Sequence, residues 1–329
     1  MSLSRPRARL TVDGRSLSSA QAALVRLTVG LSLSGAHDSA ELTVWPASKL
    51  ATAEPGTPLA IALGEDGDEA DVWAGELAVV AAGPDGVILD GLAGTVVLSR
   101  RRLSQSYLDR SVADVVQDLA SQAGAEVDQV EGDTNLPAYA VDDRRPVWDH
   151  LLALARLTGA DVGASPAGAL RFVPPKRGSA DWRLRHGADV LSWSGGAAHR
   201  SQPEEVPAIA AYGAASEAGA EQWHWVLRSP SPSGDGPLQV VAALRTIDAA
   251  ETMQRSLAQR AARGGFAGRL ALVGRPAVRP GDLVQVSDLP GSNPGTLRVR
   301  AVTHRLDARS GFVTTLTVEA AGAGGEALL

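Results

Sequence analysis

The sequence contains no cysteine, which excludes disulfides and any chemistry that depends on a thiolate. It also lacks an excess of positive charge, because 31 Lys and Arg residues stand against 37 Asp and Glu residues. A surface that binds nucleic acid needs a surplus of basic side chains, at least locally. The two short basic clusters, at 5–9 and 100–102, fit a solvated face or a subunit contact better. We therefore expect no specificity for nucleic acid.

Long hydrophobic runs are missing as well. No stretch has the length and apolarity of a membrane span, and no apolar segment of signal-peptide length follows the basic N-terminus. We therefore expect synthesis as a soluble cytoplasmic product with no direct membrane span. Aromatic residues make up only 4% of the chain, whereas 35 glycines and 19 prolines indicate the many turns of a short-stranded β protein. A chain of 329 residues predicts two or three domains.

The signatures of common catalytic sites are also absent: there is no His-Glu-x-x-His, no phosphate-binding loop and no Gly-x-Ser-x-Gly. His304 and Asp307 are two possible metal ligands, but strand alternation places them on opposite faces and a third ligand is missing. His224 lies between Trp223 and Trp225. That pair suits carbohydrate stacking, and it suits a barrel wall or a subunit contact better. We expect no enzyme activity, no cofactor and no bound metal.

Residues 1–100 predict a first β-barrel domain. Asp13-Gly14 is a tight hairpin signal between two apolar runs. After it, apolar and polar residues alternate strictly, as in a half-buried strand, with Val25, Leu27, Val29, Leu31 and Leu33 on one face. Further strand-like runs occur at 42–45, 59–63, 72–80 and 87–89, separated by turn residues.

Residues 101–178 predict a small α/β insert, because the hydrophobic period changes to that of a helix. Ser111 and Asp114 form a helix-start signature, and Gly124 ends the run. A second helix begins at Pro146 and ends before Gly159, after which residues 160–173 read as a hairpin. The predicted core of the two helices consists of Val112, Val115, Leu119, Trp148, Leu151 and Leu152.

Residues 179–320 predict a second β-barrel domain that carries one helix near 248–263. Its strand candidates are 190–193, 208–213 and 223–227, and the Ser- and Pro-rich stretch 229–237 is an expected loop. Asp248 and Glu251 mark the start of the helix, and Gly264-Gly265 marks its end. Residues 321–329 are rich in glycine and read as a flexible tail.

The closing stretch has the clearest strand pattern. Arg279-Pro280-Gly281-Asp282 opens a strand with a turn, and residues 307–311 supply a hairpin loop. Between them, Leu297, Val299 and Ala301 alternate with Arg298 and Arg300, which predicts that the arginines lie on the solvent face. After the loop, one dry face is expected to hold Phe312, Thr314, Leu316 and Val318.

An internal echo links the two β regions. Residues 56–63, 72–82 and 87–89 follow the same order of turn and strand signals as 279–286, 295–307 and 312–318. The repeat is one of pattern, with little residue identity. It favours two similar barrels separated by the insert.

The closing barrel, "RPGD-LVQV…G-TLRVRAVTHRLD…SGFVTTLTV", resembles that of the phage late control protein D family, which includes the hub part of VgrG proteins. The stretches "DRSVADVVQDLASQAG", "YAVDDRRPVWDHLLALARLTGADV" and "ALRFVPP" resemble the α/β insert of the same family. The residues that carry the resemblance in the closing barrel are Arg279, Pro280, Gly281, Asp282, Thr303, His304 and Gly311.

The resemblance implies a β-rich α+β fold with two tube-like barrels and a small α/β insert. It also implies a structural baseplate hub of a contractile phage tail or injection system, in which three chains place six barrels on a hexameric inner tube. The expected partners are the chain itself as a homotrimer, the tube protein, a spike protein and other baseplate proteins. Because the sequence ends soon after the second barrel, the spike is expected to be a separate chain. A tail-associated peptidoglycan hydrolase and a carbohydrate-binding β protein are the alternatives.

Overall fold

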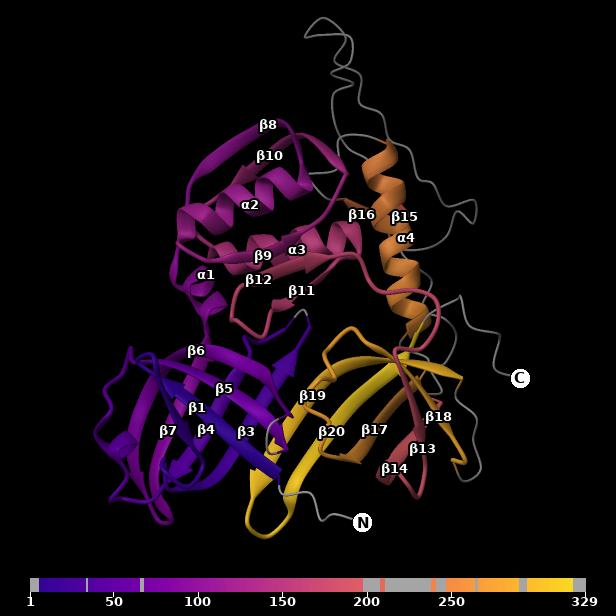
Figure 1. Cartoon of the computed structure of the whole chain (residues 1–329). Helices are drawn as coiled ribbons and strands as arrows, with labels where there is room; N and C mark the ends of the chain where they lie inside the picture. The colour runs from indigo at the N-terminus through magenta and orange to yellow at the C-terminus, as the bar shows by residue number, and fades with distance from the viewer. Residues whose placement is uncertain are drawn as a thin grey trace, which may run out of the picture.

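The computed structural model describes residues 6–33, 35–65, 68–197, 208–210, 238–240, 247–263, 266–289 and 295–321. The fold is β-rich α+β, with two tube-like barrels side by side and an α/β insert above them (Figure 1). Several expected features fall outside the described residues: the strand at 223–227 with His224, the loop at 229–237 and nearly all of the tail.

The first barrel contains the strands that the alternating sequence predicts. They are β1 Pro6–Val12, β2 Arg15–Ser18, β3 Leu24–Ser32, β4 Ser39–Val44, β5 Pro58–Glu65, β6 Asp68–Gly83 and β7 Gly86–Ala93, with short 3-10 turns at Lys49–Thr52 and Gly94–Val96. Asp13 and Gly14 both have positive φ, at 47° and 74°, as the two-residue hairpin turn requires. In β3 the expected face is buried except at Val25, which is exposed because a bulge interrupts the start of the strand.

The α/β insert forms around two amphipathic helices. Its elements are α1 Val97–Arg100, β8 Gln105–Ser111, α2 Val112–Ala123, β9 Val127–Val130, β10 Asn135–Val141, α3 Val147–Thr158, β11 Asp161–Ala164 and β12 Leu170–Val173. Ser111 and Asp114 form a capping box at the start of α2, as predicted, and Gly124 ends the helix in the left-handed conformation. Pro146 is the N-cap of α3, one position earlier than the first helical residue.

The predicted helix core is largely buried. Val112, Val115, Leu119 and Leu151 have no exposed surface and Trp148 has little, whereas Leu152 is only partly buried and packs at the edge of the cluster. Within the described residues, no helix combines the length and apolarity needed to cross a membrane.

The second barrel is built from β13 Trp182–Arg185, β14 Val190–Ala197, β17 Phe266–Val273, β18 Leu283–Ser287, β19 Thr296–Asp307 and β20 Gly311–Ala320. Between β14 and β17 the chain also forms β15 Ala208–Ala210, β16 Leu238–Val240 and α4 Ile247–Arg263. The place of α4 in the sequence predicts that it belongs to this barrel. Its buried residues Ala249, Ala250 and Met253 instead join the core of the insert, because its apolar stripe faces α3.

One continuous thirteen-stranded sheet runs through both barrels. They meet where β3 pairs antiparallel with β19, from Arg26 opposite Asp307 to Ser32 opposite Ala301. The buried apolar residues of both barrels form a single cluster. The two halves are therefore joined by backbone hydrogen bonds and by a shared core.

The two barrels repeat one topology. Strands pair in the order β1-β5-β6-β7-β4-β3 in the first and β13-β18-β19-β20-β17-β14 in the second, so each strand has a counterpart at the same place in both chain order and sheet order. The copies differ in one orientation, since β1 is antiparallel to β5 whereas β13 is parallel to β18. The echo seen in the sequence is a structural duplication.

Shared bulges align the copies residue by residue. β6 shifts register between Leu77 and Val79, and β19 shifts between Val299 and Ala301. The starts of β3 and β14 also carry matching shifts, between Leu24 and Arg26 and between Val190 and Ser192. When the bulge of β6 is aligned with that of β19, the strand registers match Leu89 of β7 with Leu316 of β20. Aligning the shifts of β3 and β14, and following the registers through β4 and β17, gives the same match.

The burial of α3 yields a stability prediction. Leu151→Asp should abolish soluble expression, because an unpaired charge in the core costs several kcal/mol, comparable with the stability of a domain. Leu152→Asp should give folded protein with a lower melting temperature, since its side chain reaches solvent. Soluble yield and thermal melting measure both, and Leu151→Met is the matched control of similar volume. Normal yield of Leu151→Asp would contradict the packing.

Candidate functional site at the junction of the barrels and the insert

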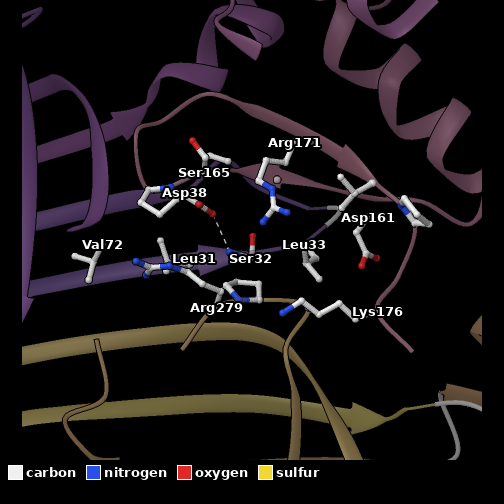
Figure 2. Close-up of a pocket in the computed structure, with 17 residues that line it drawn as sticks. Leu31, Ser32, Leu33, Asp38, Val72, Asp161, Ser165, Arg171, Lys176 and Arg279 are labelled. Carbon is white, nitrogen blue, oxygen red and sulfur yellow. Dashed lines mark hydrogen bonds between the residues drawn. The ribbon is translucent and has the colours of Figure 1, made fainter. Parts of the chain in front are cut away.

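A cavity of about 280 Å³ lies where the insert meets both barrels (Figure 2). The end of β3 forms one wall, the turn at 279–281 forms the floor, and the hairpin β11–β12 covers it. Most of the lining is apolar. Its charged side chains are Asp38, Asp161, Arg171, Lys176 and Arg279.

The Arg-Pro-Gly-Asp turn predicted from the sequence lies at this junction. Gly281 has φ +94°, a conformation that strains residues with a side chain, and its N–H donates to the Val299 carbonyl at 2.8 Å. The Asp282 carboxylate accepts bonds from the Arg279 N–H at 2.9 Å and from Trp182 Nε1 at 3.0 Å. The turn therefore ties β13 to β19.

Asp282 also holds the link between the insert and the second barrel. Its Oδ1 lies 2.6 Å from Lys176 Nζ, which contacts Asp181 at 3.4 Å as well. Lys176 follows the last strand of the insert, so this ion pair fixes the chain where it enters the second barrel. Burial opposes the charge on Lys176, but the hydrogen bond and charge of Asp282 raise its pKa.

A buried ion triad joins the insert to β19 and β20. Arg298 is only 3% exposed and contacts Asp161 of β11 through Nη2 and Glu319 of β20 through Nη1, at 2.6 Å from Glu319. The strand alternation wrongly predicted a solvated Arg298. The residue does lie on the outer side of the barrel, but the insert covers that side. Burial alone would lower the pKa of Arg298, and the two carboxylates raise it.

Arg279 connects the second barrel to the first, and its charge acts on the buried Asp38. Asp38 Oδ1 accepts the Ser32 N–H at 2.8 Å, and the Arg279 Nη2 donates to the Asp71 carbonyl. Burial raises the pKa of Asp38 to about 7, although the Ser32 hydrogen bond and the Arg279 charge act against the rise. The same burial lowers the pKa of Arg279.

Trp148 fixes the insert on the first barrel. Its Nε1 donates to the Gly35 carbonyl at 3.2 Å, and its ring lies 4.4 Å from that of His37. His37 in turn bonds Thr95 Oγ1 at 3.0 Å and Ser99 Oγ at 2.6 Å. Trp148 was predicted only as a helix core residue. Here it serves both as core and as an interdomain contact.

The remaining predicted family residues lie in the last hairpin. His304 is fully buried, with Nδ1 3.0 Å from Thr314 Oγ1 and its ring 5.9 Å from Phe312. Burial, with Arg279 nearby, lowers the pKa of His304 to about 3. Thr303 is exposed on the opposite face of β19, and Gly311 closes the hairpin with φ +69°. No three His, Asp or Glu side chains gather as a metal site among the described residues.

Sequence reasoning missed the polar contacts that hold this junction: Asp38, Asp161, Lys176, Arg298 and Glu319. The one local signal is an arginine between Leu297 and Val299 in an otherwise apolar run. That signal does not reveal that the insert packs over this face of β19, because Asp161 belongs to a different domain.

The triad gives a second prediction. Arg298→Leu should lower the free energy of unfolding by about 3 to 5 kcal/mol, because two carboxylates would lose their buried partner. The double variant Arg298→Leu with Asp161→Asn should recover part of that loss, since one unpaired charge is removed. Chemical denaturation of both variants measures the difference. Equal stability of Arg298→Leu and the parent would contradict a buried triad.

His304 gives a pH prediction. Its pKa of about 3 in the folded state lies below the value of 6.5 for an exposed histidine. The neutral His304 therefore contributes to the free energy of unfolding above pH 6.5, and this contribution is lost as the pH falls toward 3. By pH 5 the loss is about 2 kcal/mol. Asp38 acts in the opposite sense, because its raised pKa gives stability that is lost as pH rises from 3.8 through about 7.

Comparison with His304→Gln separates the two groups, because Asp38 is common to both proteins. The stability advantage of the parent over His304→Gln should shrink by about 2 kcal/mol between pH 8 and pH 5. Urea denaturation at matched pH measures the difference. A gap that does not change with pH would contradict a neutral buried His304.

No family model and no curated protein matches the sequence. Among solved structures, the chain is similar to the tail protein from Neisseria meningitidis, at 15% identity over 96% of each chain with a TM-score of 0.70. It is similar to the 43 kDa tail protein of prophage MuSo2 from Shewanella oneidensis, at 14% identity over 95% of this chain and 98% of that one, with a TM-score of 0.66. It also matches the E. coli c3393 protein, a type VI secretion component, at 10% identity over 90% of this chain and 73% of that one, with a TM-score of 0.56. At such identities the likeness shows the fold, which this chain shares with phage tail proteins.

Proposed function

We propose that this protein is a structural, non-catalytic hub in the baseplate of a contractile phage tail or a phage-tail-like injection system. In this proposal three copies assemble around an axis and connect a hexameric inner tube to a trimeric spike. The single observation that carries it is the duplication of one barrel topology, with shared bulges, inside one chain.

The duplication supports the hub role through symmetry. Three chains with two equivalent barrels each present six similar units around an axis, which matches a sixfold tube on one side and a threefold spike on the other. The β3–β19 joint already holds two such units side by side in one continuous sheet. A protein with unrelated domains would not solve this mismatch of symmetry.

The solvent face of the β3–β19 joint supports a role as the wall of a passage. A hollow crosses the joint, and apart from Val313 the side chains that line it are polar or charged: Arg26, Thr28, Glu41, Arg269, Thr303, Arg305, Ser310 and Thr315. The opposite face of the same strands is apolar and closed in the common core. A sheet with one dry face and one face rich in polar and charged side chains suits a ring whose inner surface remains hydrated.

The resemblance of fold also supports the proposal. Two of the similar structures are described as tail proteins, one of them from a prophage, and one as a component of a type VI secretion system. Lys176, Arg279 and Arg298 at the junction are engaged in contacts that hold domains together, which fits a scaffold.

The assembly state tests the proposal. Light scattering coupled to size exclusion should give three times the chain mass of 33.9 kDa, either alone or with the spike protein. Electron microscopy of the protein mixed with tube protein should show the trimer at the end of the tube. A chain that stays monomeric with both partners would contradict the hub role, and degradation of purified peptidoglycan would contradict the non-catalytic part.

A further inference from the structure

We propose that the subunits join through two open sheet edges: β14 of one copy pairs antiparallel with the second half of β6 in the next copy. The register places Gly196 opposite Ala81. This inference rests on the proposed function and names the surface through which the copies meet. The partner is a second copy of this chain.

Both edges are open in the described part of the chain. β14 stands at one end of the strand order and pairs only with β17 along residues 192–197. β6 pairs with β5 as far as Glu76, and beyond the bulge it pairs only with β7. From Val79 to Gly83, β6 therefore has one edge without a neighbouring strand among the residues that the structure describes.

The composition of the two edges favours pairing. β14 reads Val-Leu-Ser-Trp-Ser-Gly-Gly-Ala, and residues 79–83 read Val-Val-Ala-Ala-Gly, without a charge or a proline in either. Proteins usually protect free edges with lysine, proline or a covering loop, because an unprotected edge recruits another strand. Val79 is 47% exposed, which adds apolar surface beside the β6 edge.

The partner and the register follow from the duplication. Within the chain, β3 of the first barrel pairs with β19 of the second. The counterpart of β3 is β14 and the counterpart of β19 is β6, so repeating the same joint sets β14 against β6. A single chain uses this joint once and leaves the equivalent pair open.

The register shifts show that the edges of β14 and β6 match those of β3 and β19, which already pair within the chain. β3 shifts register between Leu24 and Arg26, and β14 shifts between Val190 and Ser192. Aligning these two shifts matches Arg26 with Ser192 and therefore Gly30 with Gly196. Thr303 faces Gly30 in the existing joint, and its counterpart in β6 is Ala81. The predicted neighbours of that pair are Val80 with Ala197, Ala82 with Gly195, and Gly83 with Ser194.

Small residues leave the β14 backbone accessible. A Cβ at Gly196 would meet no atom within 4 Å, so the surface there is unobstructed. Gly195 and Gly268 lie under the Trp193 ring, where a Cβ would come within 3 Å of it, and that ring stacks on Phe266 at 5.8 Å. The largest side chain of β14 is thus turned toward its own barrel.

The absence of cysteine makes a cross-linking test direct. The double variant Ala81→Cys with Gly196→Cys should form disulfides between chains under mild oxidation and give covalent dimers and trimers on a non-reducing gel. Opposed residues in antiparallel strands have Cβ atoms about 4.5 to 5.5 Å apart, close to the range that a disulfide spans. A short bis-maleimide serves as a second linker.

Two matched variants control for folding and register. Gly30→Cys with Thr303→Cys places the same pair in the existing joint, and its disulfide should form within one chain. Ala82→Cys with Gly196→Cys shifts the pair by one residue and puts the cysteines on opposite faces, so it should link at most slowly. Thermal melting of the reduced proteins checks that each variant folds.

The outcomes separate this inference from the proposed function. Trimers by light scattering that link at 81 and 196 support both. Trimers that fail to link, or that link no faster than the shifted control, overturn the register and leave the hub role intact. A ladder that continues beyond three chains overturns the closed ring. A protein that remains monomeric with tube and spike partners, while the control pair links within the chain, overturns both.

Discussion

The antiparallel pairing of β3 with β19 is the contact on which the rest of the structure depends. It joins residues 269 to 281 positions apart and turns two barrels into one sheet with one core. Buried backbone groups must find partners, so the ladder fixes the relative position of the barrels more firmly than apolar contact alone. The Arg279 turn and the insert are then placed against a rigid base.

Charged residues hold the insert on that base. Arg298 with Asp161, and Lys176 with Asp282, are ion pairs between segments that the sequence keeps far apart, and Glu319 of the neighbouring strand β20 also pairs with Arg298. Buried ion pairs add little net stability, because desolvation offsets the attraction. They do penalise any other arrangement, since a shifted insert would leave charges buried and unpaired. The contacts therefore favour one orientation of the insert on the barrels.

The local elements were predictable because their signals are local. Two-residue alternation gave β3 and β20, and the Ser111 and Asp114 pair gave the start of α2. The duplication was visible as an order of turns and strands without residue identity. The solvated position predicted for Arg298 was wrong, because strand periodicity tells which side a residue faces and does not tell what covers that side. The packing of α4 on α3 was missed for the same reason.

The sequence by itself determined the strands of the first barrel, the closing strands of the second, the insert helices and the tight turns, since these depend on neighbours within a few residues. Only the tertiary structure decided that Trp148 reaches Gly35, that Asp38 is buried beside the Arg279 turn, and that β6 and β14 keep edges without a strand partner among the described residues. Such features depend on which distant strands pair. Strand pairing is set by the balance of many weak backbone and core contacts across the whole chain, and no single segment carries it.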